Sequence, residues 1–272
     1  MPTVSVVQLA PVLGDLEGNH ARVTEAVRHA GTEVVVVPEL AISGYVFADA
    51  EEARSLARPA GEAVAPWVGV AGETGALVAG GFAELGDDGR VYNSAALVDG
   101  SGVLAVYRKL HLWDREKLVF TPGQEFPPVV ETALGRIGLC VCYDVEFPEV
   151  SRGLALRGAE LVCVPTNWPD EGRPAGERPM EVVRIMAAAS INRLFIAAAD
   201  RTGVERGVDW VGASAIASPG GWLLAGPATS GAEAILSASC DLAEARDKRL
   251  NERNDVLADR RPDVYAQVPT IA

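Results

Sequence analysis

The order of hydrophobic and polar positions at the start of the chain predicts a strand, a helix and a second strand. Val4–Leu9 first alternates and then runs apolar, which is typical of a strand. Residues 19–30 place apolar side chains at the helical spacing i, i+3, i+4 and i+7. Val34–Val37 is a short β-branched run, as expected for a strand buried on both faces. This order predicts a parallel pair of strands joined by a crossover helix.

The middle of the chain has the pattern of an antiparallel meander, which follows a further predicted helix at 62–74. The strand-like segments are Ala76–Glu84, Val91–Val98 and Val103–Arg108. Short runs of glycine, aspartate and serine separate them, and such runs are typical of hairpin turns. We therefore expect the parallel unit to continue into strands connected by hairpins.

The second half of the chain resembles the first. Its predicted strands are Arg136–Cys142, Leu161–Pro165 and Leu194–Ala199, and its predicted helices cover 147–158 and 178–191. A second meander is expected over Val211–Ser218, Gly221–Leu224 and Ala232–Cys240, before a helix at 241–250 and a tail over 260–272.

Two similar halves predict an α/β fold with two mixed sheets. If the sheets pack face to face with helices outside, both sets of strands are buried, which gives a four-layer α-β-β-α sandwich. No linker or low-complexity stretch separates the halves. We therefore expect a single domain over residues 1–272, with a C-terminal tail at about 251–272.

Composition and charge exclude several classes of function. The chain has 272 residues with 37 acidic and 24 basic side chains, a formal net charge of −13. Such acidity disfavours non-specific nucleic-acid binding and adsorption to an anionic membrane. No apolar run approaches the ~20 residues that span a bilayer, and the N-terminal residues lack the basic segment of a secretory signal. Together with four cysteines, too few for a disulfide framework in a chain this long, these features predict a reduced, cytoplasmic protein.

Two charged residues follow predicted strands at the ends where active sites form in α/β sheets. Glu39 follows Val34–Val37, and partial burial there would raise its pKa towards that of a general base. Lys109 follows the last strand of the first meander, and an inward-pointing lysine could donate to a developing oxyanion. Either residue could equally be solvated at the end of a strand, so neither position decides the function alone.

Cys142 lies where a predicted strand meets a predicted helix. We expect a cysteine at such a corner to be exposed at the top of the sheet, beside a helix N-terminus that lowers its pKa and supplies N–H donors. The same geometry underlies the nucleophile elbow. Cys140 lies inside the strand and fits a core position better. A redox or metal-binding pair of Cys140 and Cys142 is a competing hypothesis, although no third and fourth metal ligand is evident.

Taken together, these segments resemble a known family. The shared motifs are Pro38-Glu39-Leu40 with Ser43-Gly44-Tyr45, Arg108-Lys109-Leu110-His111-Leu112, Cys142-Tyr143-Asp144 with Phe147-Pro148-Glu149, and Val164-Pro165-Thr166-Asn167-Trp168. In this order the chain resembles the nitrilase superfamily, the carbon–nitrogen hydrolases, over nearly its whole length.

The resemblance implies a set of catalytic residues. The family's glutamate, lysine and cysteine fall on Glu39, Lys109 and Cys142, and a second glutamate of many members falls on Glu116. The cysteine is implied to attack an amide carbon while Glu39 transfers protons, and Lys109 and the backbone N–H of Tyr143 are implied to stabilise the oxyanion. Neither a metal nor an organic cofactor is implied.

The resemblance also implies a substrate and a set of residues that bind it. The segment after the cysteine looks most like that of small aliphatic amidases, which release ammonia through a thioester. An ω-amidase or an N-carbamoyl amidohydrolase is the alternative within the superfamily, and a non-catalytic member is another. The implied substrate-binding residues are Tyr45, Tyr143, Glu146, Asn167 and Trp168. The family's pairing of subunits implies a homodimer or a larger homo-oligomer.

Two positions qualify this resemblance. Glu146 would repel a substrate carboxylate and favour a neutral or amine-bearing tail, unless it only stabilises the N-terminus of the following helix. Asp200 stands where family members often carry asparagine, and we expect it to alter local hydrogen bonding rather than chemistry.

Overall fold

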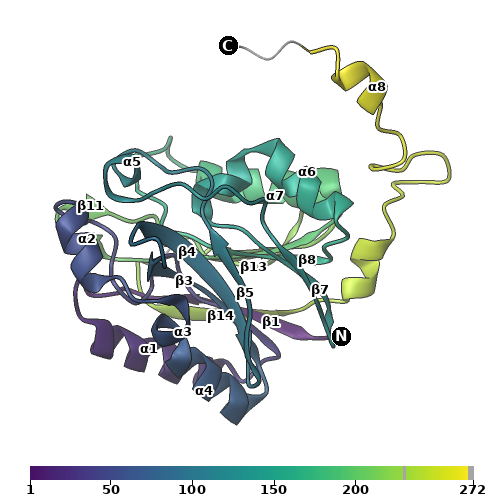
Figure 1. The fold of residues 1–272 in the computed structure, drawn as a ribbon. Coiled ribbons are helices and arrows are strands. Elements are labelled where there is room, and N and C mark those ends of the chain that lie inside the picture. The colour runs from purple at the N-terminus through teal and green to yellow at the C-terminus, as the bar shows by residue number, and fades with distance from the viewer. Residues whose placement is uncertain (229–230, 269–272) are drawn as a thin grey trace.

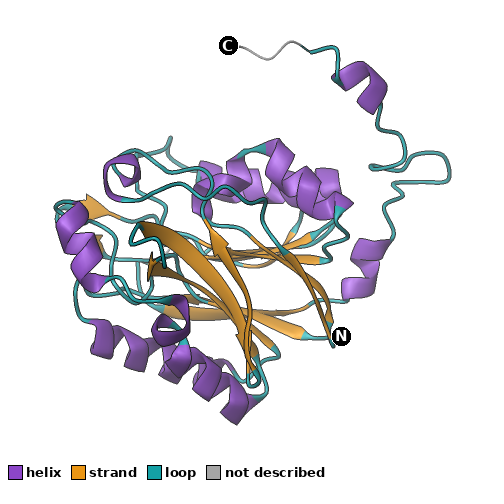
Figure 2. Cartoon of the chain, viewed as in Figure 1, coloured by secondary structure: helices purple, strands orange, loops and turns teal. Residues whose placement is uncertain are grey.

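The structure, a computed structural model, describes residues 1–228 and 231–268 and contains two six-stranded sheets (Figures 1 and 2). The first sheet contains, in spatial order, β14 (Ala234–Ser239), β1 (Thr3–Gln8), β2 (Val34–Val36), β3 (Leu77–Leu85), β4 (Val91–Asp99) and β5 (Gly102–Arg108). The second contains β13 (Leu223–Ala225), β12 (Ala215–Ala217), β9 (Phe195–Ala199), β8 (Leu161–Pro165), β7 (Gly135–Leu139) and β6 (Val129–Thr132). A short separate ribbon pairs β10 (Val204–Glu205) with β11 (Val208–Asp209).

Helices cover the outer faces of both sheets. One side carries α1 (Leu16–Ala30), α3 (Ala60–Ala63) and α4 (Ala65–Thr74), and the other carries α6 (Pro148–Leu156) and α7 (Met180–Asn192) (Figure 1). Shorter elements are α2 (Ala50–Leu56), α5 (Glu116–Val119), α8 (Pro262–Tyr265) and two 3₁₀ turns at Cys142–Glu146 and Leu242–Arg246. None of the helices in the described part of the chain is long and apolar enough to cross a bilayer. The predicted four-layer α-β-β-α sandwich is confirmed.

The two halves use the same pairing pattern. In the first sheet β1, β2 and β3 are parallel neighbours, and β4 and β5 follow antiparallel. In the second, β7, β8 and β9 are parallel neighbours, and β12 and β13 follow antiparallel. The predicted repetition of one half is therefore visible in the strand order.

The strand β2 shows why a central strand of this sandwich has apolar side chains on both of its faces. Val34 and Val36 belong to the core between the sheets, whereas Val35 and Val37 pack with α1 and α4. All four side chains have no exposed surface. The β-branched run therefore sits in a central strand, as predicted, and its carboxyl end lies deep between the layers.

Several predicted boundaries are wrong. The predicted second meander does not form, because β14 does not pair with β13. It pairs antiparallel with β1 and so covers the edge that β1 would otherwise leave open in the first sheet. The strand predicted at 136–142 ends at Leu139, the helix predicted at 62–74 is two helices, and the helix predicted at 241–250 is a 3₁₀ turn. Residues 269–272 of the predicted tail lie outside the described residues.

Candidate active site

Loops that leave the two facing sheets bring the predicted site residues together. Glu39 follows β2, Lys109 follows β5, and Cys142 begins the 3₁₀ turn after β7. Asn167 follows β8, and its side-chain Nδ2 donates to the backbone oxygen of Glu39 at 2.8 Å. This hydrogen bond joins the loops of opposite sheets, so the site is built on both halves of the fold.

Glu39 is completely buried at a place where two backbones approach closely. A Cβ atom on Gly81 of β3 would lie 2.5 Å from the Glu39 Cα, so only glycine fits there. Asn93 of β4 donates from Nδ2 to Glu39 Oε1 at 2.7 Å. The other oxygen, Oε2, is buried without a hydrogen-bond partner among the described residues. That oxygen is therefore available to take up a proton.

Lys109 lies between two carboxylates. Its Nζ donates to Glu39 Oε1 at 2.7 Å and to Glu116 Oε1 at 2.8 Å, and the lysine has no exposed surface. The Tyr45 hydroxyl donates to the same oxygen of Glu116 at 2.5 Å, and the Trp113 backbone N–H donates to the other at 3.0 Å. A buried charge needs such partners, because desolvation of an unpaired ion is very costly.

The protonation states in this cluster follow from burial and charge. Burial raises the pKa of Glu39 to about 7, and Glu116 acts in the same direction, while Lys109 opposes both. Burial alone would lower the pKa of Lys109, but the Glu116 and Glu39 carboxylates raise it well above its ordinary value. Lys109 is therefore an ammonium at neutral pH, and Glu39 titrates in the range of an effective general base.

Cys142 occupies a strained position at the edge of this cluster. Its φ of 46° is in the left-handed region, which residues other than glycine rarely adopt. Its Sγ lies 3.8 Å from the backbone oxygen of Asn167. The residue is only 6% exposed, so the expectation of an exposed corner is wrong.

The expected lowering of the cysteine pKa is also wrong. Burial raises the pKa of the Cys142 thiol well above its ordinary value, and the Glu39 carboxylate adds to this effect. The residue begins a short 3₁₀ turn, and α6 starts only at Pro148, so the chain does not enter an α-helix directly after the sulfur. The resting group is a thiol that needs a base.

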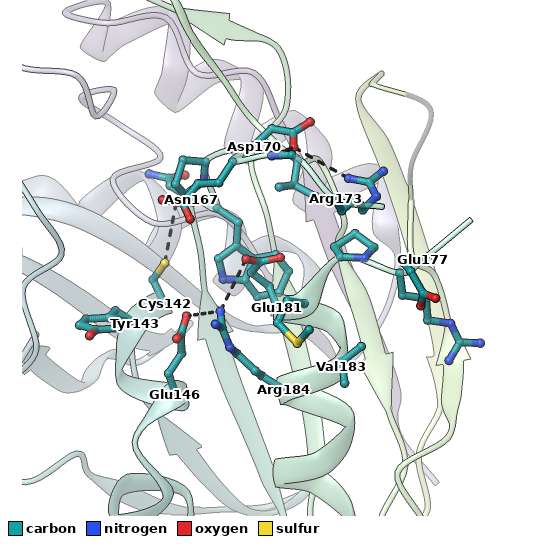
Figure 3. Close-up of a pocket in the computed structure, with 18 of the residues that line it drawn as sticks. Cys142, Tyr143, Glu146, Asn167, Asp170, Arg173, Glu177, Glu181, Val183 and Arg184 are labelled. Atoms are coloured by element: carbon teal, nitrogen blue, oxygen red, sulfur yellow. Dashed lines mark hydrogen bonds and ion pairs between the residues drawn. The ribbon is translucent and has the colours of Figure 1, made fainter. Parts of the chain in front are cut away.

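A cavity of about 490 Å³ opens over Cys142 (Figure 3). Five predicted site residues line it, namely Cys142, Tyr143, Glu146, Asn167 and Trp168. Trp113 also lines it, and its ring meets the Tyr143 ring edge to face at 4.8 Å between centroids. The wall therefore combines aromatic surface with a cysteine thiol.

A second cavity of about 120 Å³ adjoins the first through Trp113. Tyr45 and Glu116, the remaining predicted site residues with access to a cavity, line this smaller one. Glu39 and Lys109 have no exposed surface.

Glu146 does not act as an isolated charge. Its Oε1 lies 2.9 Å from Arg184 Nη1, and the same guanidinium nitrogen lies 3.6 Å from Glu181 Oε1 (Figure 3). Burial raises the pKa of Glu146, and Arg184 opposes that shift. Two carboxylates thus share one arginine in the wall of the cavity, which leaves a net negative charge.

Sequence reasoning missed two residues of the site. Asn93 was not selected, although a polar side chain among the apolar residues of β4 is a usable signal. Trp113 was not selected either, and its position in a loop offers no comparable signal. The contact of Arg184 with Glu146 joins residues far apart in sequence, so no local pattern predicts it.

The cysteines and acids do not form a recognisable metal site. Among residues 1–228 and 231–268, no group of three histidine, cysteine, aspartate or glutamate side chains is arranged to hold a metal ion. Cys140 lies in the core between the sheets and is a free thiol, as are Cys142, Cys163 and Cys240.

Comparison with known proteins agrees with this geometry. The sequence profile of the carbon-nitrogen hydrolase family matches residues 3–250. A nitrilase from Pyrococcus abyssi is 36% identical over 270 residues, which cover 97% of this chain and 99% of that protein. An N-carbamoylputrescine amidase from Solanum lycopersicum is 32% identical over 293 residues, which cover 99% of this chain and 95% of that protein.

Solved structures give the same result. A variant of the amidase from Nesterenkonia sp. AN1, in which acrylamide has added to the active-site cysteine, is 28% identical and superposes with a TM-score of 0.79. The match covers 98% of this chain and 99% of that one. The chain therefore belongs to the carbon-nitrogen hydrolases of the nitrilase superfamily.

Proposed function

We propose that this chain is an amidase that hydrolyses small aliphatic amides to a carboxylate and ammonia through a thioester on Cys142. The observation that supports this most strongly is the buried ammonium of Lys109, held between Glu39 and Glu116. Glu116 lines the smaller cavity, which adjoins the larger cavity lined by Cys142. This arrangement supplies a base, a cation and a nucleophile without a cofactor.

In the first half-reaction, Glu39 takes the proton of the Cys142 thiol, and the sulfur attacks the amide carbon. The carbonyl electrons move to oxygen, where Lys109 and the backbone N–H of Tyr143 stabilise the negative charge. When the carbonyl re-forms, the C–N bond breaks, and Glu39 passes the proton to the departing nitrogen, which leaves as ammonia. An acyl thioester remains on Cys142.

In the second half-reaction, Glu39 removes a proton from water, and the resulting hydroxide attacks the thioester carbon. The C–S bond breaks, the proton held by Glu39 returns to the sulfur, and the carboxylic acid leaves and releases its remaining proton to solvent as it becomes a carboxylate. The raised pKa of Glu39 suits both half-reactions, because a base is most effective when its pKa lies near the working pH.

Glu116 is assigned a positioning role in the same scheme. It accepts hydrogen bonds from Lys109 and Tyr45 and lines the smaller cavity. It would therefore keep the ammonium directed at the oxyanion, and it would accept a hydrogen bond from the substrate amide.

The charges around the larger cavity favour a neutral or amine-bearing tail on the substrate. Glu146 and Glu181 share Arg184, so a positive tail would meet excess negative charge, whereas a carboxylate would compete with two carboxylates for one arginine. Hydrolysis of N-carbamoyl compounds is the second candidate, because several relatives are named N-carbamoylputrescine amidase. An ω-amidase fits these charges less well.

The deciding experiment is ammonia release from a panel of small aliphatic amides, ω-amino amides, ω-carboxyl amides, N-carbamoyl amines and nitriles. We expect the neutral and ω-amino amides to give the highest kcat/KM and Cys142→Ala to give none. A panel without turnover would reject the proposal. Metal analysis of the same sample tests the competing redox or metal hypothesis for Cys140 and Cys142.

We also propose that the chain forms a homodimer or a larger homo-oligomer and acts in the cytoplasm. The α7 residues Met180, Val183 and Ile191 expose apolar surface, as do Val264 and Tyr265 of α8, which stands away from the body (Figure 1). Sedimentation of the full chain beside a chain ending at residue 250 tests whether this segment contributes to association.

A further inference from the structure

The carboxylate of Asp144 joins the nucleophile turn to the segment that carries Lys109. Asp144 has no exposed surface and lies two positions after Cys142. Its Oδ2 accepts hydrogen bonds from the backbone N–H of Val141 at 3.1 Å and from the Tyr107 hydroxyl at 2.8 Å. The first of these donors directly precedes Cys142, and the second lies two positions before Lys109.

The second oxygen of Asp144 binds the other end of the same segment. Its Oδ1 accepts from the His111 backbone N–H at 3.1 Å and lies 2.7 Å from His111 Nδ1. Tyr107 and His111 stand two positions before and two positions after Lys109. One carboxylate therefore holds both flanks of the lysine and the residue that precedes the cysteine.

Aromatic packing supports the same connection. The His111 ring stacks on Phe147, with 3.7 Å between centroids and an interplanar angle of 14°. Phe147 follows directly after the 3₁₀ turn that begins with Cys142. The Tyr107 hydroxyl also accepts from the Leu110 backbone N–H at 3.1 Å, which further fixes the loop around the lysine.

The strain at Cys142 explains why such a connection is needed. A left-handed φ on a residue other than glycine is strained and persists only where the surroundings hold it. The hydrogen bond from Val141 holds the residue immediately before the strained position. The four contacts to Asp144 thus oppose relaxation of the turn.

We infer that Asp144 is a positioning residue that sets the distance and orientation between the Cys142 sulfur and the Lys109 ammonium. It does not line the cavity over the cysteine, so it acts through Val141, Tyr107 and His111 rather than on the substrate. This inference rests on the proposed function, because it assumes that sulfur and ammonium act on the same substrate carbon and oxygen.

The inference is tested with Asp144→Asn and Tyr107→Phe. The asparagine amide presents N–H groups to one pair of donors. The phenylalanine removes the two hydrogen bonds of the Tyr107 hydroxyl, one to Asp144 and one from the Leu110 backbone N–H, and keeps the packing of the ring. We expect kcat to fall by roughly 10²-fold in Asp144→Asn and roughly tenfold in Tyr107→Phe, with KM changed by less than about threefold. The double variant should fall little below Asp144→Asn, because both changes remove the same connection.

The matched control is Tyr92→Phe. Tyr92 lies on β4 and donates its hydroxyl to Asp88 at 2.6 Å, so this variant loses the same kind of hydrogen bond outside the site. Its kcat should stay at the wild-type value. An equal loss in Tyr92→Phe and Tyr107→Phe would overturn the inference.

A second measurement separates this inference from the proposed function. The rate of Cys142 alkylation by iodoacetamide, followed by peptide mass spectrometry across pH, reports on the sulfur without requiring turnover. We expect slower alkylation and an altered pH profile in Asp144→Asn and Tyr107→Phe. A wild-type chain that hydrolyses no amide would end the proposed function but leave this readout valid. If Asp144→Asn does not fold, Tyr107→Phe decides, and a wild-type kcat and alkylation profile in Tyr107→Phe overturns the inference.

Discussion

The site has a buried end, formed by Glu39, Lys109 and Glu116, and an open mouth, which includes Arg184, Arg173 and Asp170. The two regions hold their charges in different ways. At the buried end, Lys109 and Glu39 have no exposed side-chain surface, and Glu116 has 2%. At the mouth, the Arg184 side chain is 40% exposed, and the pair of Arg173 with Asp170 is 36% and 41% exposed. Buried charges need nearly ideal partners, whereas exposed pairs contribute only ~0–1 kcal/mol.

This difference in exposure suggests two roles, with the chemistry at the buried end and the choice of substrate at the mouth. The buried cluster stands at the ends of β2 and β5 and at the start of α5, and its three side chains have almost no exposed surface. The mouth is formed largely by the segment between β8 and α7, which lacks regular secondary structure over most of its length. Substitutions at the buried end should therefore lower kcat, whereas substitutions at the mouth should change KM and preference among substrates.

The largest expected effect comes from Cys142, the proposed nucleophile. Cys142→Ala should reduce kcat to background, a loss of roughly 10⁶-fold, because no thioester can form. Cys140→Ala is the matched control, because Cys140 lies in the core beside the same turn and has no assigned role in the chemistry. Ammonia release and circular dichroism measure the two variants. Loss of activity in Cys140→Ala alone would reverse the assignment.

The next largest effect comes from Glu39, the proposed general base. Glu39→Gln should lower kcat by roughly 10²–10⁴-fold, because the amide keeps the shape and removes the proton acceptor. In the wild type, Glu39 must be ionised to act, so kcat/KM should fall as pH drops below about 7. Glu84→Gln is the control, since Glu84 is also a buried glutamate paired with a cation, Arg108, outside the site. A pH profile without an acid limb would contradict this role for Glu39.

The sequence predicts the buried end better than the mouth, for a physical reason. Glu39 and Lys109 follow strands whose apolar patterns locate them, and parallel strands end at one side of a sheet. The pairing of Glu146 with Arg184 joins a 3₁₀ turn to α7, and no pattern within either segment predicts it. Long-range contacts of exposed side chains leave little trace in local sequence.

The errors at the nucleophile have a similar origin. The apolar run continues to Val141, but the strand ends at Leu139, because β7 pairs with β8 only through Leu139. Cys142 is buried against Asn167, which follows another strand, and near Glu39 and Lys109, so a pattern confined to residues 136–142 does not report its burial. The pairing of β14 with β1 is not predicted for the same reason, since the alternating burial pattern of β14 is compatible with either sheet.

A smaller effect is expected at the mouth. Glu146→Gln should raise kcat/KM for an ω-carboxyl amide relative to its ω-amino counterpart by about fivefold, because it leaves Arg184 with one carboxylate partner instead of two. Glu177→Gln is the control, as Glu177 is an exposed glutamate that lines the same cavity without contacting Arg184. An unchanged ratio in Glu146→Gln, or the same change in both variants, would remove Glu146 from substrate selection.

The smallest effect concerns Asp200, which binds the backbone of Trp168, one of the residues that line the larger cavity. Its carboxylate is fully buried and accepts hydrogen bonds from the backbone N–H groups of Trp168 at 2.9 Å and Ala213 at 3.0 Å. Burial raises the pKa of Asp200 to about 7 against these hydrogen bonds, which lower it. The folded state thus favours the protonated form, and the resulting stability is lost as pH rises through about 7.

Asp200→Asn removes this titration and should therefore gain stability relative to the wild type as pH increases. We expect the difference in Tm between the two proteins to move by a few degrees in favour of Asp200→Asn between pH 5 and pH 8.5. Glu39 titrates with the same sign in both proteins, so it cancels from the difference. Thermal melts at several pH values measure the shift. A Tm difference that stays constant across this range would show that Asp200 is ionised throughout and does not make the stability of the folded protein depend on pH.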